Sequence, residues 1–286
     1  MKMVSNRKLI VGLHLVAAVV VVALFAGGLP YYLSPLSSRP RHELYWILKP
    51  GGERGHLLGI VGSLMMIAML SYSLRKRWSS LHRLGSLSKW LDVHIFFGIW
   101  GPLLVILHSS FKVNGLVAVS FWSMVAVALS GVFGRFLYVQ IPRAQDGDEL
   151  SANEAKELDD QLSRMLIEDY GLDSEALDEV NDLAERGIDL GASLPVLFAL
   201  TVLDPLVLRR RLRPAWRSFH TDDPALRRRF VQTVMRKAAL RRRMLLWDRV
   251  RELFHYWHVL HKPFAVLMYL FMVVHVAVAV ATGYAL

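Results

Sequence analysis

Four histidines form two pairs with the same spacing. His94 and His108 lie fourteen residues apart in LDVHIFFGIWGPLLVILHSSFK, and His261 and His275 lie fourteen apart in WHVLHKPFAVLMYLFMVVHVAV. Fourteen residues of α-helix are close to four turns, so the imidazoles of each pair share a face and stand about 21 Å apart along the axis. Each helix therefore presents two metal ligands, one above the other.

The equal spacing predicts which histidines meet. If one span crosses back between the two helices, they run parallel, so His94 meets His261 and His108 meets His275. Each meeting offers two neutral imidazoles to opposite faces of an iron, which is bis-histidine haem ligation. His258 precedes His261 by one turn, and its spacing of seventeen to His275 is out of phase. It is a reserve ligand or a supporting residue. The predicted cofactors are two haem b groups with the four paired histidines as axial ligands.

Simpler interpretations compete with haem. A histidine inside a membrane by default marks a function, but a single one can also bond a carbonyl on a neighbouring helix. Metal transport usually recruits intramembrane carboxylates, and only Asp92 lies near a predicted span. The chain has no cysteine, which excludes thiolate-bound iron–sulfur clusters and covalent haem. Two helices with the same spacing favour haem.

The helices that must position these histidines are long and apolar. The chain is 54% hydrophobic and 20% charged, with a mean hydropathy of +0.35. The first apolar run is about 21 residues, longer than a signal peptide core, so we expect a retained helix. The sequence predicts an all-α integral membrane protein whose five transmembrane helices form a haem-binding bundle. The predicted spans are Leu9–Leu29, His56–Leu74, Trp90–Phe111, Gly115–Val139 and Pro263–Leu286.

The basic residues predict the orientation. With a cytoplasmic N-terminus, the outside segments 30–55 and 112–114 hold five of the 34 Lys and Arg residues. This asymmetry favours the cytoplasmic (inner) membrane, with the N-terminus cytoplasmic and the C-terminus outside. The net charge of +10 is then explained by cytoplasmic loops, and no nucleic-acid partner is expected.

A long insertion separates the fourth and fifth spans. The expected domains are 1–140 (helices one to four), 141–257 (a helical cytoplasmic insertion) and 258–286 (helix five, which completes the bundle). Residues 146–189 hold 16 of the 24 acids, and 209–251 hold 15 basic residues. Two amphipathic helices are expected in the acidic part, capped by Ser151 and by Asp173 or Ser174. Residues 192–208 are apolar but short and interrupted by proline, so we expect a buried or interfacial helix there.

Glycines and cations accompany the histidines. Gly98 and Gly101 lie between the two ligands of the third span, where a haem face or another helix needs close approach. Gly59 and Gly62 on the second span, like Gly131 and Gly134 on the fourth, could serve close helix packing. Four cations could meet haem propionates or act as interfacial anchors: Arg83, Lys89 and Lys262 near the first pair, and Lys112 near the second.

On the paired histidines His94, His108, His261 and His275, spans two to five resemble the ferric reductase-like transmembrane domain family, and the wider dihaem membrane cytochromes b share the spacing. The resemblance implies two stacked b haems on the third and fifth helices. The chain departs from the reductases in its long insertion and in the lack of a sixth helix. No G-x-G-x-x-G follows a strand, so we expect no FAD- or NAD(P)H-binding domain.

The expected function is electron transfer across the membrane by one subunit of an oxidoreductase complex, not by a complete enzyme. A cytoplasmic flavin or iron–sulfur protein would dock on the charged insertion. One alternative is a quinone-reactive cytochrome b anchor subunit in which Asp92, His258 or His56 handles protons. Another is a haem-free membrane anchor whose basic segment 209–251 binds anionic membrane lipid.

Overall fold

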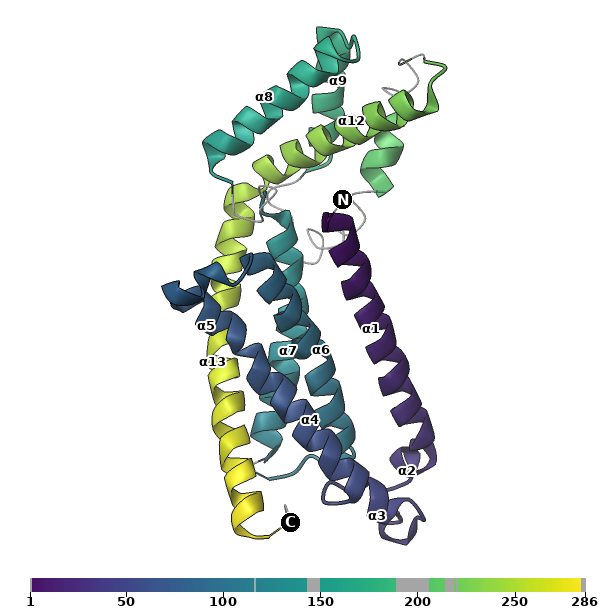
Figure 1. The fold of residues 1–286 in the computed structure, drawn as a ribbon, viewed down its shortest axis with the longest axis vertical. Coiled ribbons are helices and arrows are strands. Elements are labelled where there is room, and N and C mark those ends of the chain that lie inside the picture. Colours follow the sequence, from purple (N-terminus) through teal and green to yellow (C-terminus); the bar gives the residue numbers. More distant parts are fainter. Residues whose placement is uncertain are drawn as a thin grey trace. The chain divides into compact units, whose positions relative to one another are not determined.

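The computed structural model is helical throughout the residues it describes, with no strand among them (Figure 1). It forms two compact units, Met1–Phe133 with His258–Leu286, and Gly134–Trp257. All but the last three residues of the predicted helix at 192–208 lie outside the described part of the chain. The described residues are 2–115, 117–142, 150–188, 206–213, 219 and 221–283.

Five helical stretches are long and apolar enough to cross a membrane, as the sequence predicts. They are Lys8–Gly27 within α1 (Lys2–Gly27), Tyr45–Arg77, Leu87–Ser109 (α6), Val117–Gln140 (α7) and Trp247–Ala281 (α13). The second stretch joins α3 (Tyr45–Leu48), α4 (Glu53–Met69) and α5 (Ser71–Arg77). α13 begins at Trp247 instead of the expected Pro263, because the polar residues before the proline continue the same helix. Short helices complete the unit: α2 (Leu29–Leu33), η1 (Arg39–Arg41) and η2 (Ser79–Arg83).

The outer faces of these helices are apolar. Val19, Leu129 and Val266 are each about two-thirds exposed, at 69%, 67% and 66%. A soluble protein rarely exposes contiguous apolar surface on this scale, whereas hydrocarbon solvates it at no cost. The exposed faces therefore agree with a membrane protein.

Glycines let α4 and α6 pack closely. A Cβ added at Gly62 would lie 2.9 Å from the carbonyl oxygen of Gly101, and one at Gly101 would lie 3.2 Å from that of Gly62. Contacts between α4 and α6 thus involve backbone against backbone, as in other small-residue membrane interfaces. This contact packs α6, the helix that carries His94 and His108, directly against α4.

α6 and α13 run in the same direction, with α7 returning between them in sequence (Figure 1). α7 and α13 are joined through Ser120, whose hydroxyl donates to the carbonyl of Met268 at 3.1 Å. α1 attaches to α6 through Trp100, whose indole N–H donates to His14 Nδ1 at 3.0 Å. Polar bonds of this kind join helices in a bilayer, where water cannot replace them.

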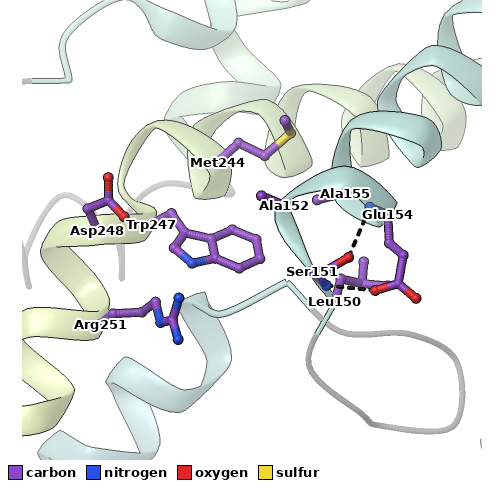
Figure 2. Close-up of a pocket in the computed structure, with 9 residues that line it drawn as sticks. All are labelled: Leu150, Ser151, Ala152, Glu154, Ala155, Met244, Trp247, Asp248 and Arg251. Carbon is purple, nitrogen blue, oxygen red and sulfur yellow. Dashed lines mark hydrogen bonds between the residues drawn. The ribbon is translucent and has the colours of Figure 1, made fainter.

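The second unit packs α8 (Ala152–Glu168), α9 (Ser174–Glu185), residues 206–212 and α12 (Pro224–Leu245) around a core that includes the fully buried Phe230 and Val234. The predicted caps are confirmed: Ser151 forms a capping box with Glu154, and Asp173 accepts from the backbone of Ala176. Figure 2 shows Trp247 and Arg251 facing the start of α8 across a pocket of about 620 Å³.

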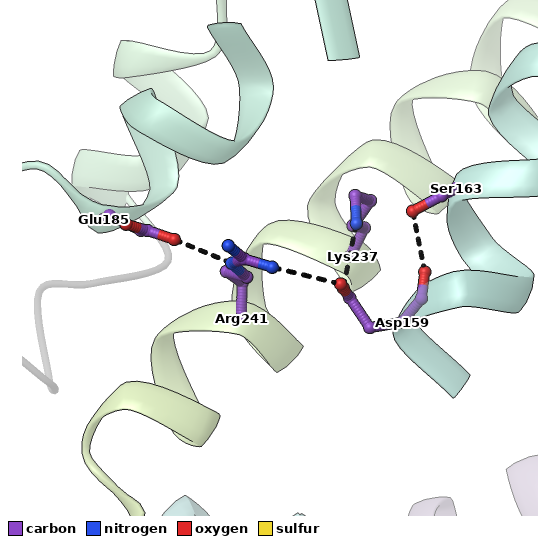
Figure 3. Close-up of polar contacts among 5 residues, drawn as sticks. All are labelled: Asp159, Ser163, Glu185, Lys237 and Arg241. Atoms are coloured by element: carbon purple, nitrogen blue, oxygen red, sulfur yellow. Dashed lines mark hydrogen bonds and ion pairs between the residues drawn. The ribbon is translucent and has the colours of Figure 1, made fainter. Parts of the chain in front are cut away.

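A buried ion pair ties these helices together. Lys237 Nζ lies 2.9 Å from Asp159 Oδ1, with both side chains almost fully buried. Arg241 stands between Asp159 Oδ2, at 3.4 Å, and Glu185 Oε1, at 2.7 Å (Figure 3). Ser163 completes the group by donating to the carbonyl of Asp159 at 2.9 Å. Since removal of one partner would leave a buried charge, which costs about 3–5 kcal/mol, this network fixes α8 and α9 on α12.

Candidate functional site

His94 on α6 is held by the end of α4. Its Nδ1 lies 3.1 Å from the carbonyl oxygen of Met69, and its ring packs against Tyr72 with centroids 5.2 Å apart. α4 ends at Met69 and α5 begins at Ser71, and carbonyls in the last turn of a helix are free to accept bonds from side chains. Because a carbonyl only accepts, the neutral ring carries its proton on Nδ1. Its lone pair is therefore on Nε2.

His108 is held in the same way at the other end of α4. Its Nδ1 lies 2.8 Å from the carbonyl oxygen of Gly55. A Cβ added at Gly59 would lie only 2.6 Å from that Nδ1 atom. The close packing expected at Gly59 is thus a contact with the His108 imidazole. Nε2 of this ring again keeps the lone pair.

The two histidines of α13 have different surroundings. Nδ1 of His261 lies 2.7 Å from the hydroxyl of Ser130 on α7. That hydroxyl also lies 2.9 Å from the carbonyl oxygen of Val127, and when it donates its proton there, it accepts from the imidazole N–H of His261. His275 is half-buried and forms no hydrogen bond with the residues that the structure describes.

The four imidazoles lie in two groups. His261 is within electrostatic range of His94 and of His258. His108 is within electrostatic range of His275 and of His56. We call His94 with His261 the His94 level, and His108 with His275 the His108 level. This grouping follows the fourteen-residue spacing on the two parallel helices.

Four buried methionines pack together within the bundle: Met66, Met124, Met268 and Met272. Along α13, Met268 and Met272 fall between the two histidines, and the Tyr269 hydroxyl donates to the carbonyl of Met66 at 2.5 Å. Sequence reasoning missed this cluster, although the spacing of the two α13 methionines places them on the face of His261. Methionine is flexible and polarisable, so it packs well against irregular or flat groups.

Arg39 is a buried cation that sequence reasoning also missed. Its guanidinium donates to the carbonyls of Ser34 at 3.0 Å, Tyr32 at 2.7 Å and Ser110, and only 7% of the residue is exposed. Among the described residues no carboxylate pairs with it. It caps α6 two residues beyond His108. Burial raises the pKa of Tyr32, and Tyr31 adds to this effect while Arg39 opposes it.

The cations expected near the histidines do not contact them. Arg83, Lys89, Lys112 and Lys262 are exposed and form no ion pair with another described residue. Nor does the described part of the chain contain three or more His, Asp or Glu side chains grouped to hold a metal ion. The four histidines are thus not part of such a group among the described residues.

Comparison of the chain with family models, with curated proteins and with solved structures gave no match. The resemblance to the ferric reductase-like family therefore stays a prediction that rests on the four histidines and their helices.

Proposed function

We propose that this protein is a dihaem membrane cytochrome of the b type that moves electrons across the cytoplasmic membrane. His94 and His261 would hold one haem, and His108 and His275 the other. A haem supplies a reversible one-electron couple at its iron. The chain's own residues would hold, space and insulate the two groups.

One observation carries the proposal. In His94 and His108, Nδ1 donates to a backbone carbonyl, and this leaves the Nε2 lone pair for another group. Nδ1 of His261 is also hydrogen-bonded, to the Ser130 hydroxyl. Ligating histidines usually donate their second ring N–H in this way, which fixes the tautomer and the ring orientation. A histidine that only links two helices and binds no metal could make the same hydrogen bond from Nδ1. The matched fourteen-residue spacing on two parallel helices is what favours ligation over that interpretation.

The residues present fit a haem better than a bare ion. A porphyrin supplies four equatorial nitrogens, so two imidazoles complete six-coordinate iron, whereas a bare ion held by protein needs three or four side chains. The surrounding methionines and Tyr269 form a water-excluding, adaptable wall. The cluster supports packing against large flat groups at the two levels.

The proposed path runs between the two levels, about 21 Å apart along the helices. The asymmetry of basic residues supports a cytoplasmic N-terminus and a cytoplasmic second unit. A separate flavin or iron–sulfur protein would exchange electrons at the His94 level, and the donor or acceptor outside at the His108 level. The protein would then be an electron-transfer subunit of an oxidoreductase complex.

The test is a haem-to-protein ratio with reduced-minus-oxidised spectra on the purified chain. The wild type should bind two haems with b-type spectra. His94→Ala/His261→Ala removes both ligands of one level and should keep one haem. His94→Ala/His275→Ala damages both levels and should keep none. Both double variants remove two imidazoles, so each serves as the control for the other.

Two results would contradict the proposal. A colourless wild-type protein after expression with haem supply would exclude a cytochrome and favour the membrane anchor. Equal haem content in the two double variants would show that the ligands are paired differently or lie elsewhere.

A quinone-reactive subunit is the second candidate. His56 lies within electrostatic range of His108, which supplies a protonatable side chain beside one level. Reduction of the haems by a quinol, lost in His56→Gln but with haem content unchanged, would support this function. Unchanged quinol reduction in that variant would remove His56 from it.

A further inference from the structure

Arginines line a groove in the second unit, between residues 206–213 and the first half of α12. Its cavity volume is about 830 Å³, and Arg209, Arg227, Arg228 and Arg236 lie along it. An adjoining hollow of about 590 Å³ shares Leu206 and Arg209. We call the first of these cavities the basic groove.

The basic groove also has an apolar lining. Leu206, Val231 and Met235 face it, and Leu206 is 71% exposed. The core of the unit lies behind, with Phe230 and Val234 fully buried. Apolar side chains beside exposed guanidinium groups fit a ligand that has both an anionic and an apolar part.

The chain's described carboxylates do not neutralise this groove. Its four arginines form no ion pair with any described residue. Asp159 and Glu185 are engaged with Lys237 and Arg241, and Asp223 caps its own helix by accepting from Ala225 at 2.8 Å. No described carboxylate therefore competes with an external anion for the positive charge along the groove.

We propose that the basic groove binds an anionic phospholipid, with the phosphate among the arginines and an acyl chain against the apolar side chains. Arginine binds phosphate in a bidentate fashion, and basic pockets beside membrane helices recruit anionic headgroups. The groove lies in the second unit, and the inference does not depend on haem.

Chain connectivity favours a lipid over an acidic soluble partner. α12 ends at Leu245 and α13, which carries the last candidate span, begins at Trp247. Only Leu246 separates the helix that forms the groove from the helix that enters the apolar span. The helix that lines the groove is thus linked through a single residue to the helix that holds a candidate span, and the apolar side of the groove has no role in binding a purely polar anion.

The test uses the full-length protein in detergent, titrated with dioleoyl phosphatidylglycerol or dioleoyl phosphatidylcholine and read by native mass spectrometry. Arg228→Gln/Arg236→Gln should weaken phosphatidylglycerol binding by about tenfold or more, because each surface cation contributes about 1 kcal/mol. Lys156→Gln/Arg164→Gln on α8 removes the same charge from exposed positions outside the groove, and should leave binding unchanged. Met235→Glu should weaken lipid binding without removing a cation.

The outcomes separate the possible ligands. Inorganic phosphate should compete poorly with phosphatidylglycerol, and equal competition would overturn the proposal because it would leave the apolar side without a role. Equal retention of phosphatidylglycerol by the groove and α8 variants would also overturn it, as would no preference over phosphatidylcholine. Haem content measured on the same samples should not change between variants, so failure here is distinct from failure of the dihaem proposal.

Discussion

The two histidine levels differ in how firmly the protein holds them. At the His94 level both rings have an Nδ1 partner, the Met69 carbonyl and the Ser130 hydroxyl. At the His108 level only the α6 ring has one among the described residues, the Gly55 carbonyl. At that level Gly59 also packs closely against the ring, and the buried Arg39 donates to the carbonyl of Ser110, two residues beyond His108. The His94 level is thus fixed by hydrogen bonds to both rings, and the His108 level by one hydrogen bond and by close packing on the α6 ring.

The largest expected effect tests the packing at the His108 level. Gly59→Ala places a Cβ where only 2.6 Å separates it from His108 Nδ1, so the ring must move. Overpacking of this kind costs about 1–3 kcal/mol and displaces the ligand. We expect the haem-to-protein ratio to fall from two toward one, with the remaining spectrum that of the His94 level.

Gly12→Ala is the matched control, because a Cβ at Gly12 meets nothing within 4 Å and the residue lies in a candidate span. It should keep both haems. If Gly59→Ala also kept both haems with unaltered spectra, contact with Gly59 on α4 would not position the His108 ring.

The next effect concerns charge at the His108 level. Arg39→Gln removes a buried cation near the proposed haem, so the reduced state loses stabilisation and the midpoint potential of that haem should fall. Two charges some 10 Å apart at an effective dielectric near 20 interact by about 1.7 kcal/mol, which corresponds to about 70 mV for one electron. Potentiometric titration of both haems measures this.

Arg39→Lys keeps the charge and loses the planar bonding to Tyr32 and Ser34. A purely structural Arg39 would make both variants alike in potential and in stability. The proposed electrostatic role requires that the glutamine variant lower the potential and that the lysine variant largely preserve it.

A smaller effect is expected at the His94 level. Ser130→Ala removes the hydrogen-bond partner of His261 Nδ1. Ligation through Nε2 requires that Nδ1 be the donor, so without its acceptor the ligand becomes less basic and the oxidised iron less stable. The potential of that haem should rise by about 20–30 mV, less than the change from a whole charge. Ser120→Ala, on the same helix but bonded to the carbonyl of Met268, is the control. A change in the potential of the haem at the His108 level alone would contradict the role assigned to Ser130 at the His94 level.

Features set by local sequence could be predicted, and those set by tertiary contacts could not. The five spans follow from long apolar runs, and the caps at Ser151 and Asp173 follow from short-range bonding. The Met69 carbonyl and the Ser130 hydroxyl reach their histidines across 25 and 131 residues. No periodicity encodes such pairings, because they depend on where helices break and cross.

Arg39 is a second feature that tertiary contacts set and that the local sequence does not predict. An arginine in a segment between spans suggests a solvated residue, and the positive-inside count treats it only as a charge. Its burial arises because Ser34, Tyr32 and Ser110 bring three carbonyls together from two helix ends and a loop. Arg83 and Lys89 lie near His94 in the sequence, which makes them candidates to meet a propionate or to anchor the span, and both are exposed in the structure.

The smallest expected effect separates His258 from its neighbour. His258 lies within electrostatic range of His261 and one turn before it, yet its spacing to His275 is seventeen residues, out of phase with the pairs on α6. His258→Ala should therefore keep both haems, with at most a slight shift in the potential of the His94 level. His261→Ala should lose one haem. The reverse result would make His258 the ligand and would shift the His94 level by one turn along α13. The Ser130 bond would then be a contact of a structural histidine.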